Sequence, residues 1–443
     1  MEYGAAVFGN AAKTNLDKLQ VVQNAYIRQA MRYLPSTPVH VMLAESGQLP
    51  MMLRIEALTK RELVRTTYFR TPIMKFVSDA LCKEMGNGSY LTETADKHVD
   101  LLYQVHPSDK ELPRKKRMRY FRSSDLFMTV RLNLGGKNVK KDNVSEESWR
   151  RIYREEENTT YKNYERIFTD GSKSEAGVAF AVYDDNRKRK AAESINSNFT
   201  ITNAELLAIL QAVETAKKEN YKKAVIFTDS RSACEMLLNE DIIANNYIAW
   251  EIYKELQDTR ENTIKIQWIP SHVGIRGNEV ADQAAKQKSR EKQTFFNGLT
   301  MADALRLSNL DIWADWSRRY KEQSKTKGCW HFNLMETPGR KIWSHELQLN
   351  PDEVKTLNRI RSGHALTKSK RATWGWEIDD QCDWCEVKED IKHILYDCPK
   401  FNIERNKYPI LEYMKPIEQV LIELCEEELK QITRFIKDTK SQI

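Results

Sequence analysis

Four acidic residues near the middle of the chain are spaced so that they could share one site. Asp170 and Asp229 each follow a short apolar run typical of a β-strand, whereas Glu205 and Asp282 lie in helical stretches. Because strand ends meet at one edge of an open α/β sheet, we expect the carboxylates to converge there. Four carboxylates that close repel one another unless cations lie between them.

Two divalent metal ions would relieve that repulsion and also supply chemistry. In two-metal sites the ions lie about 3.5–4 Å apart, and one activates water while the other stabilises the departing oxygen. Magnesium is the expected metal because it prefers hard oxygen ligands and keeps bound water. The acidic residues therefore predict a hydrolytic site that uses magnesium.

Each acid taken alone also has an ordinary structural explanation. Asp170 belongs to an Asp-Gly pair, which is common in turns. Glu205 follows Thr202 by three residues, as in a capping box, and Asp229 could cap the helix that follows it. Asp282 could be an exposed helix acid. Only the combination of all four acids favours a catalytic role over these structural roles.

One histidine strengthens the hypothesis. His272 lies in a glycine-containing loop, ten residues before Asp282 on the next helical stretch. A side chain so placed could reach the metal site without being part of it, and could move a proton or help the product leave. A loop histidine alone is usually inert, so its value depends on these neighbours.

Hydrophobic patterning predicts the elements that position these residues. Strands are predicted at 166–171, 177–183, 190–197, 224–228 and 264–269, and helices at 203–219, 230–238, 247–257 and 278–287. The order βββαβααβα predicts an α/β fold with a mixed five-stranded sheet flanked by helices. Its first three strands form an antiparallel meander, and parallel strands with crossover helices extend it.

The motifs in this stretch resemble cellular and retroelement ribonuclease H, over roughly Glu165 to Arg290. They are Thr169-Asp170-Gly171-Ser172, Asn203-Ala204-Glu205, Thr228-Asp229-Ser230, Ser271-His272-Val273-Gly274 and Gly277-Asn278-Glu279-Val280-Ala281-Asp282. The resemblance implies endonucleolytic hydrolysis of the RNA strand of an RNA–DNA hybrid, leaving 3′-hydroxyl and 5′-phosphate ends. It also implies that Asp170, Glu205, Asp229 and Asp282 ligate two magnesium ions, with His272 as a mobile helper.

The same resemblance implies contacts to the hybrid. Asn203 is expected near the ribose 2′-hydroxyl groups of the minor groove, which distinguish RNA from DNA. Ser172 and Asn278 are further candidates for nucleic-acid binding, and 187–190 is a weaker candidate for phosphate contact. The broad basic handle helix of some relatives is not evident, so affinity is expected to depend on other segments.

A second cluster predicts a zinc site. Cys382-x2-Cys385-x7-His393-x4-Cys398 provides three thiolates and one imidazole, a closed tetrahedral set suited to structural zinc. Unligated cysteines are the alternative. The cluster resembles the CCHC knuckle at the C-terminus of non-LTR retrotransposon polyproteins, although its Cys385–His393 loop is longer than in retroviral knuckles. Trp384 and nearby lysines could bind single-stranded RNA or DNA.

The N-terminal motifs also resemble those retrotransposons, in the segment after the polymerase core. They include Leu19-Gln20-Val21-Val22-Gln23-Asn24 and Glu45-Ser46-Gly47-Gln48-Leu49-Pro50. The chain is therefore expected to derive from a retrotransposon reverse transcriptase polyprotein without its polymerase core. The predicted organisation is a helical remnant at 1–70, a polar linker at 71–162, a ribonuclease H domain at 163–291, a Trp-rich helical region at 292–378, the zinc knuckle at 379–402 and a helical tail at 403–443.

Composition limits the remaining possibilities. The 443 residues are 30% charged with a net charge of +7, and no apolar run is long enough to span a membrane. The N-terminus does not resemble a secretion signal, and the basic run Pro113–Arg119 suits phosphate contact or nuclear import. We expect a nuclear or cytoplasmic location. Two other functions remain open: a catalytically silent nucleic-acid-binding protein, and a nuclease of the same fold that acts on DNA.

Overall fold

The computed structural model divides the chain into two compact units. It describes residues 4–9, 11–72, 90–106, 129–135, 144–243, 245–257, 263–291, 298–412, 415–441 and 443. Lys60–Ser308 form one unit, here called the sheet unit, and Met1–Thr59 with Asn309–Ile443 form the other, the helical unit. The basic run Pro113–Arg119 lies outside the described residues. No helix in the described ranges is long and apolar enough to cross a membrane.

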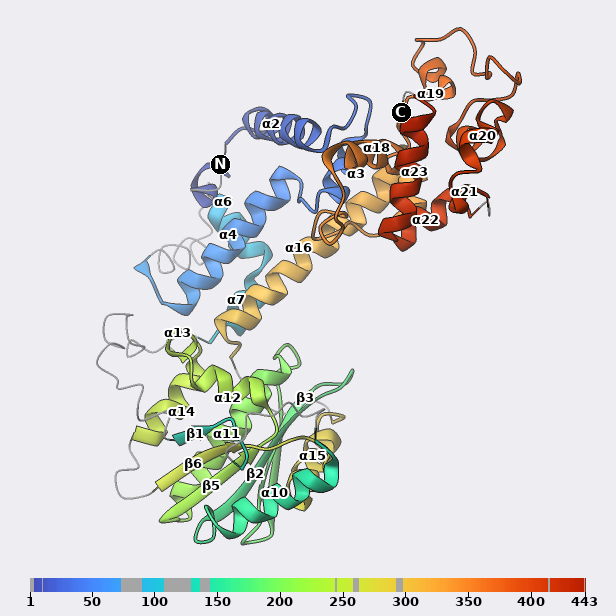
Figure 1. Ribbon diagram of the computed structural model, residues 1–443. Helices are drawn as coiled ribbons and strands as arrows, with labels where there is room; N and C mark the ends of the chain where they lie inside the picture. Colours follow the sequence, from blue (N-terminus) through green and yellow to red (C-terminus); the bar gives the residue numbers. More distant parts are fainter. Residues whose placement is uncertain are drawn as a thin grey trace. The chain divides into compact units, whose positions relative to one another are not determined.

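A mixed six-stranded sheet forms the centre of the sheet unit (Figure 1). Its strands are β1 (Val130–Arg131), β2 (Glu165–Lys173), β3 (Val178–Asp184), β4 (Arg189–Ile195), β5 (Lys223–Thr228) and β6 (Thr263–Trp268), in the order β1-β6-β5-β2-β3-β4. The meander β2-β3-β4 is antiparallel, whereas β5 is parallel to β2, β6 to β5 and β1 to β6.

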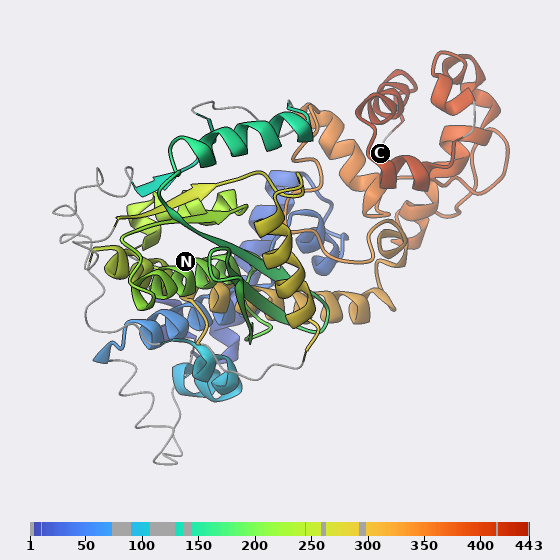
Figure 2. The same cartoon turned by 90° about the horizontal axis from the view of Figure 1, so that it is seen from below.

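Helices cover both faces of this sheet, as Figures 1 and 2 show from two directions. The helices are α10 (Glu146–Asn158), α11 (Ile201–Lys218), α12 (Arg231–Leu237), α13 (Glu240–Ile243), α14 (Tyr247–Gln257) and α15 (Arg276–Lys288). Side chains of a strand alternate between faces. Ile167 and Ile226 therefore pack with α11, α12 and α14, whereas Phe168 and Phe227 pack with α10 and α15.

The observed elements confirm the predicted α/β, ribonuclease H-like fold, with two differences in detail. The sheet has six strands instead of five, because the two-residue β1 pairs with β6. The first strand was predicted to end in a turn at Asp170-Gly171, but β2 continues to Lys173. Gly171 and Ser172 pair with Phe180 and Ala179 of β3. This pairing keeps β2 extended at the position where the turn was expected.

The predicted linker at 71–162 contains regular structure in its described parts. It forms α6 (Tyr90–Lys97), α7 (Val99–Gln104), β1 and α10. Helix α10 belongs to the core, because Trp149 lies edge-on to Trp268 at 6.3 Å between ring centres. Tyr153 likewise meets Phe227 at 5.3 Å. The segment predicted as a polar linker therefore contributes helices and one strand in these stretches.

The helical unit joins the two ends of the sequence. Its elements are α1 (Ala5–Phe8), α2 (Lys13–Met31), α3 (Val39–Glu45), α17 (Cys329–Leu334), α18 (Pro351–Arg361), α19 (Lys368–Thr373), the π-helical turn η2 (His393–Asp397), the 3₁₀ turn η3 (Pro399–Phe401), α20 (Asn402–Arg405), α21 (Pro409–Glu412), α22 (Ile417–Glu423) and α23 (Glu426–Asp438). Helices α4 (Met51–Tyr68) and α16 (Met301–Ser324) contribute residues to both units.

A buried ion pair connects the two sequence segments of the helical unit. Arg361 donates to both carboxylate oxygens of Glu45, at distances from 2.8 to 3.2 Å. His331 also faces Glu45, at 2.7 Å, and the Arg361 guanidinium lies over the Trp343 ring. Burial raises the pKa of Glu45, but Arg361 and His331 outweigh it and lower this pKa to about 2. Glu45 therefore stays ionised inside the core.

Candidate active site and metal centres

Strand register brings the first two acids together. Thr169 of β2 pairs with Thr228 of the parallel strand β5, and both lie at the carboxyl end of the β2–β5 ladder. Asp170 and Asp229 are the next residues along the two strands, so they leave the ladder side by side. This is the edge at which open α/β sheets usually hold their sites.

Helix α11 brings Glu205 to the same edge of the sheet, because Gly171 of β2 has no side chain and lets the helix pack close to the strand. A Cβ atom on Gly171 would lie 2.9 Å from the Glu205 nitrogen, so any other residue would push the helix away. The capping-box explanation for Glu205 does not hold, since Thr200 is the N-cap of α11. Asp229 is also not a cap, because the Ser230 side chain caps α12 by accepting from the Ala233 N–H.

The three carboxylates form one tight cluster. Asp170, Glu205 and Asp229 each offer an oxygen, and these oxygens lie within 4.8 Å of one another. Asp170 is 5% exposed and Glu205 is 6% exposed. Asp170 Oδ2 and Glu205 Oε2 are buried with no hydrogen-bond partner among the described residues. Buried oxygen atoms left unpaired are costly, so the cluster fits a site for a hard divalent cation such as magnesium.

Electrostatics support this interpretation. Burial, followed by repulsion from Asp229 and Asp282, raises the pKa of Asp170 to about 8. Burial and the neighbouring charges of Asp170 and Asp229 also raise the pKa of Glu205 well above its ordinary value. The protein therefore holds these groups where they resist ionisation without a cation. Such perturbed carboxyl groups are typical of functional sites.

Asp282 lies at the border of the cluster. It is half-buried on α15, and it raises the pKa of Asp170 by repulsion. Its carboxylate forms an ion pair with Lys286, one helical turn later, at 2.8 Å. Helix α15 lies close to β2 because Gly277 has no side chain: a Cβ there would lie 2.2 Å from the Phe168 ring.

Two side chains position Asp229. Asn278 on α15 donates from Nδ2 to Asp229 Oδ2 at 3.0 Å. Trp268, the last residue of β6, donates from Nε1 to the Asp229 carbonyl oxygen at 3.1 Å. Asn278 was predicted to bind nucleic acid; here it is 3% exposed and holds a carboxylate of the cluster. Its nucleic-acid contact stays a prediction.

The other predicted residues lie around the cluster. His272 is exposed in the loop between β6 and α15, with a backbone φ of 55° in the left-handed region. Ser172 lies near Ser289, with 3.4 Å between their hydroxyl oxygens. Asn203 is buried and donates to Asp303 Oδ2 at 2.6 Å, while its own oxygen accepts from Asn246 at 2.8 Å. These interactions occupy the Asn203 amide within the fold.

The cysteine and histidine side chains form a second, separate cluster in the helical unit. The four ligand atoms of Cys382, Cys385, His393 and Cys398 lie within 4.8 Å of one another. Cys382 and Cys398 sulfurs are 3.8 Å apart, and Cys385 Sγ is 3.3 Å from His393 Nε2. A tetrahedron with zinc–sulfur bonds of about 2.3 Å has edges of about 3.8 Å, so the spacing fits zinc. All three cysteines are free thiols and form no disulfide.

Local backbone structure makes this cluster possible. Gln381 and Lys388 form a bridge that closes a hairpin around Cys382 and Cys385. His393 and Cys398 are five residues apart, and the π-helical turn between them lets the Cys398 N–H donate to the His393 carbonyl at 2.9 Å. A π-helical turn joins residues at this spacing, whereas an α-helical turn would not.

The thiol groups differ in acidity. Burial raises the pKa of Cys398 to about 11. Burial also acts on Cys382, but hydrogen bonds from the Trp384 backbone and the His393 ring outweigh it and lower this pKa to about 7. Cys382 is therefore the thiol that most readily supplies a thiolate.

Fold and acidic cluster together define an α/β domain with a candidate metal-dependent hydrolytic site. Comparison with known protein families agrees: residues 162–290 match the family model for RNase H. This part of the chain is an RNase H domain, and such domains generally use divalent metal ions. The match begins one residue before the predicted domain at 163–291 and ends one residue before the end of that domain.

Sequence reasoning missed one basic surface beside this domain. A groove of about 620 Å³ on α10 is lined by Glu147, Ser148, Arg150, Arg151 and Arg154. A Cβ atom on Gly274 would lie 3.1 Å from Arg150 Cδ, so α10 borders the loop that carries His272. The apolar spacing of Trp149, Ile152 and Tyr153 could have revealed this amphipathic helix.

The acidic cluster predicts a pH dependence for the metal-free protein. Asp170 and Glu205 keep their protons in the folded state at pH values where the unfolded chain has lost them. The resulting stability is fully present below about pH 4 and is lost as the pH rises towards the folded pKa, about 8 for Asp170. In EDTA, the free energy of unfolding should fall by up to about 1.4 kcal/mol per pH unit for each retained proton.

Hydrogen–deuterium exchange of β2 and β5 amides, corrected for the intrinsic pH dependence of exchange, measures this effect. Asp170→Asn should flatten the pH dependence between pH 5 and 8, because it removes one titrating group. An equally steep decline in wild type and Asp170→Asn would show that another group causes it.

Proposed function

We propose that this protein hydrolyses the RNA strand of RNA–DNA hybrids, with two magnesium ions held by Asp170, Glu205, Asp229 and Asp282. The observation that carries the proposal is the cluster of three converging carboxylates, in which one buried oxygen of Asp170 and one of Glu205 have no hydrogen-bond partner among the described residues. Its position in a segment that matches RNase H selects the substrate class. Magnesium ions bound there would activate water and stabilise the departing oxygen.

The residues around the cluster have distinct tasks in this proposal. Asn278 holds the Asp229 carboxylate in one orientation, so that the cluster is organised before substrate arrives. Lys286 neutralises part of the Asp282 charge. His272, exposed in its loop, can accept or donate a proton at its ring nitrogens and can leave with the product.

The arginines of α10 are proposed to bind the phosphates of the hybrid next to the cleaved bond. Arg151 and Arg154 are exposed, and Arg150 adjoins the His272 loop. Arginine binds phosphate oxygens through a fixed fork of donors. The double variant Arg151→Gln/Arg154→Gln should raise the KM for hybrid about tenfold and leave kcat within about twofold, because such contacts act equally on ground and transition states.

Steady-state cleavage of a labelled hybrid measures both constants. The matched control is Lys218→Gln/Lys222→Gln, which removes two exposed charges at the far end of α11 and before β5. Equal KM values for the two double variants would refute a role of α10 in binding.

A panel of substrates tests the proposed function itself. Purified protein with magnesium is incubated with labelled hybrid, duplex DNA, duplex RNA and single-stranded RNA. Cleavage of the RNA strand of the hybrid alone, with 3′-hydroxyl and 5′-phosphate products, supports the proposal. Cleavage of duplex DNA would favour a DNA nuclease of the same fold, and tight hybrid binding without cleavage would favour a silent binding protein.

We also propose that Cys382, Cys385, His393 and Cys398 hold a structural zinc ion in a CCHC knuckle. Their spacing in the sequence and the edges of their tetrahedron support it. Trp384, between the first two cysteines, is 67% exposed and available to stack on a base of single-stranded RNA or DNA. A knuckle combined with an RNase H domain favours descent from a non-LTR retrotransposon.

A further inference from the structure

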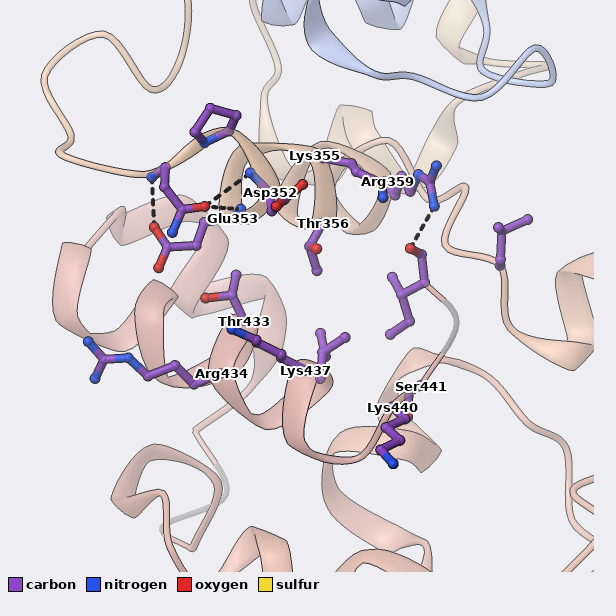
Figure 3. A pocket seen from close by; sticks show the side chains of 15 residues that line it. Asp352, Glu353, Lys355, Thr356, Arg359, Thr433, Arg434, Lys437, Lys440 and Ser441 are labelled. Carbon is purple, nitrogen blue, oxygen red and sulfur yellow. Dashed lines mark hydrogen bonds between the residues drawn. The ribbon is translucent and has the colours of Figure 1, made fainter.

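A groove of about 940 Å³ lies between α18 and α23 in the helical unit. Figure 3 shows the side chains that line it. Lys355, Thr356 and Arg359 come from α18, whereas Thr433, Arg434, Lys437, Lys440 and Ser441 come from α23 and the residues after it. Neither the acidic cluster nor the cysteine cluster contributes to its lining, so it is a separate surface.

The groove is strongly basic. Five of its lining side chains are Lys or Arg, and two, Asp352 and Glu353, are acidic. Both acids already have partners. Asp352 forms an ion pair with Arg32 at 2.7 Å, and Glu353 accepts the Asn350 N–H at 2.8 Å as part of a capping box. The groove lining therefore keeps an excess of positive charge.

The cations form two rows, one on each wall. Arg434 and Lys437 are three residues apart on α23, which places them on one side of that helix, and Lys440 lines the groove just beyond the helix end. Lys355 and Arg359 are four residues apart on α18 and again share a side. Within the described part of the chain, Lys355, Lys437 and Lys440 have no ion-pair partner. These charges remain available to a ligand.

Arg359 adds a donor on the inner side of the groove. Its Nη1 donates to the Ile443 carbonyl oxygen at 2.7 Å, the bond drawn in Figure 3. Its Nε is buried and has no hydrogen-bond partner among the described residues. Burial lowers the pKa of Arg359, which reflects the loss of water around the guanidinium. A partly desolvated cation in the groove lining favours an anionic ligand.

We propose that this groove binds the phosphodiester backbone of a nucleic acid. Two rows of cations fit a polymer with regularly repeated negative charges better than a single small anion. The hydroxyl group of Thr356 adds a donor for phosphate oxygens. An acidic peptide would bring backbone N–H groups that need acceptors, and the acids of this groove are already engaged. The inference does not depend on nuclease activity.

Fluorescence anisotropy with the full chain tests the proposal. The probes are a labelled single-stranded RNA, a single-stranded DNA of the same sequence and the RNA–DNA hybrid, each measured over a range of salt concentrations. The triple variant Arg434→Gln/Lys437→Gln/Lys440→Gln removes three exposed cations. It should weaken binding of at least one probe about tenfold. It should also reduce the slope of log K against log salt by about 2 for single strands, since each contact contributes about 0.7.

The matched control is Lys13→Gln/Lys18→Gln/Lys407→Gln, which removes three exposed charges elsewhere in the helical unit. Equal affinities and salt slopes for groove and control variants would overturn the proposal. So would a poly-glutamate peptide that binds wild type and loses affinity in the groove variant while the nucleic acids do not. Hybrid cleavage, measured on the same preparations, tests the proposed nuclease activity separately. If wild type binds nucleic acid through the groove but does not cleave the hybrid, only the proposed nuclease function is contradicted.

Discussion

Asp229→Asn is expected to reduce hybrid cleavage about a thousandfold or more while leaving the fold intact. Asp229 supplies one of three oxygens that lie within 4.8 Å of one another, so the substitution removes a metal ligand and a full charge. Metal ions in such sites contribute several kcal/mol of transition-state stabilisation, and about 4 kcal/mol corresponds to a factor of about 10³. Single-turnover cleavage of a labelled hybrid at saturating enzyme measures the loss.

The same substitution should stabilise the metal-free protein. Removal of Asp229 relieves the repulsion that raises the pKa values of Asp170 and Glu205. In EDTA we expect a gain of about 1 kcal/mol, or roughly 3 °C in Tm for a domain of this size. Lost activity with gained stability is typical of a functional cluster.

Asp241→Asn is the matched control, because Asp241 is exposed on α13 in the same unit and loses the same charge. It should change neither cleavage nor Tm measurably. If Asp229→Asn cleaved hybrid at more than a tenth of the wild-type rate, the cluster would not be the catalytic centre.

Cys398→Ser is expected to eliminate zinc from the purified protein and to unfold the cysteine cluster. Cys398 is 1% exposed and provides one of the four converging ligand atoms. A closed site with one ligand missing loses most of its affinity, and structural zinc contributes about 10–16 kcal/mol of apparent binding energy in small peptides. Mass spectrometry of bound metal should give one zinc ion per wild-type chain and none in the variant.

Cys425→Ser controls for the loss of a thiol, since Cys425 is an exposed free cysteine outside the cluster. It should keep its zinc. Hydrogen–deuterium exchange should show faster exchange around η2 in Cys398→Ser and in EDTA-treated wild type, but not in the control. A full equivalent of zinc in Cys398→Ser would contradict the assignment of this ligand.

Most of the RNase H fold could be predicted because its strands have strong periodic signals. Strands β3 and β5 begin and end within one residue of the predicted positions, since apolar runs and turn residues bound them on both sides. Strand β1 has only two residues, which is too short for an alternating hydrophobic pattern. It forms because its backbone pairs with the edge of β6. Helix α10 escaped notice because its charged residues dominate the local composition.

The acidic cluster was predictable because strand ends and helix starts are visible in the sequence. The role of Asn278 was not, since its bond to Asp229 depends on how α15 is rotated against β2. The packing of the two ends of the chain into one helical unit could not be predicted either. It rests on contacts such as Glu45 with Arg361, which are 316 residues apart and leave no local pattern.

The most direct test of the central claim is anomalous diffraction from crystals soaked in manganese, which replaces magnesium at oxygen sites. Two anomalous peaks about 3.5–4 Å apart among Asp170, Glu205 and Asp229 are the expected result. The same experiment on Asp229→Asn should lose at least one peak. Well-ordered crystals of wild type with no anomalous peak at these carboxylates would contradict the account.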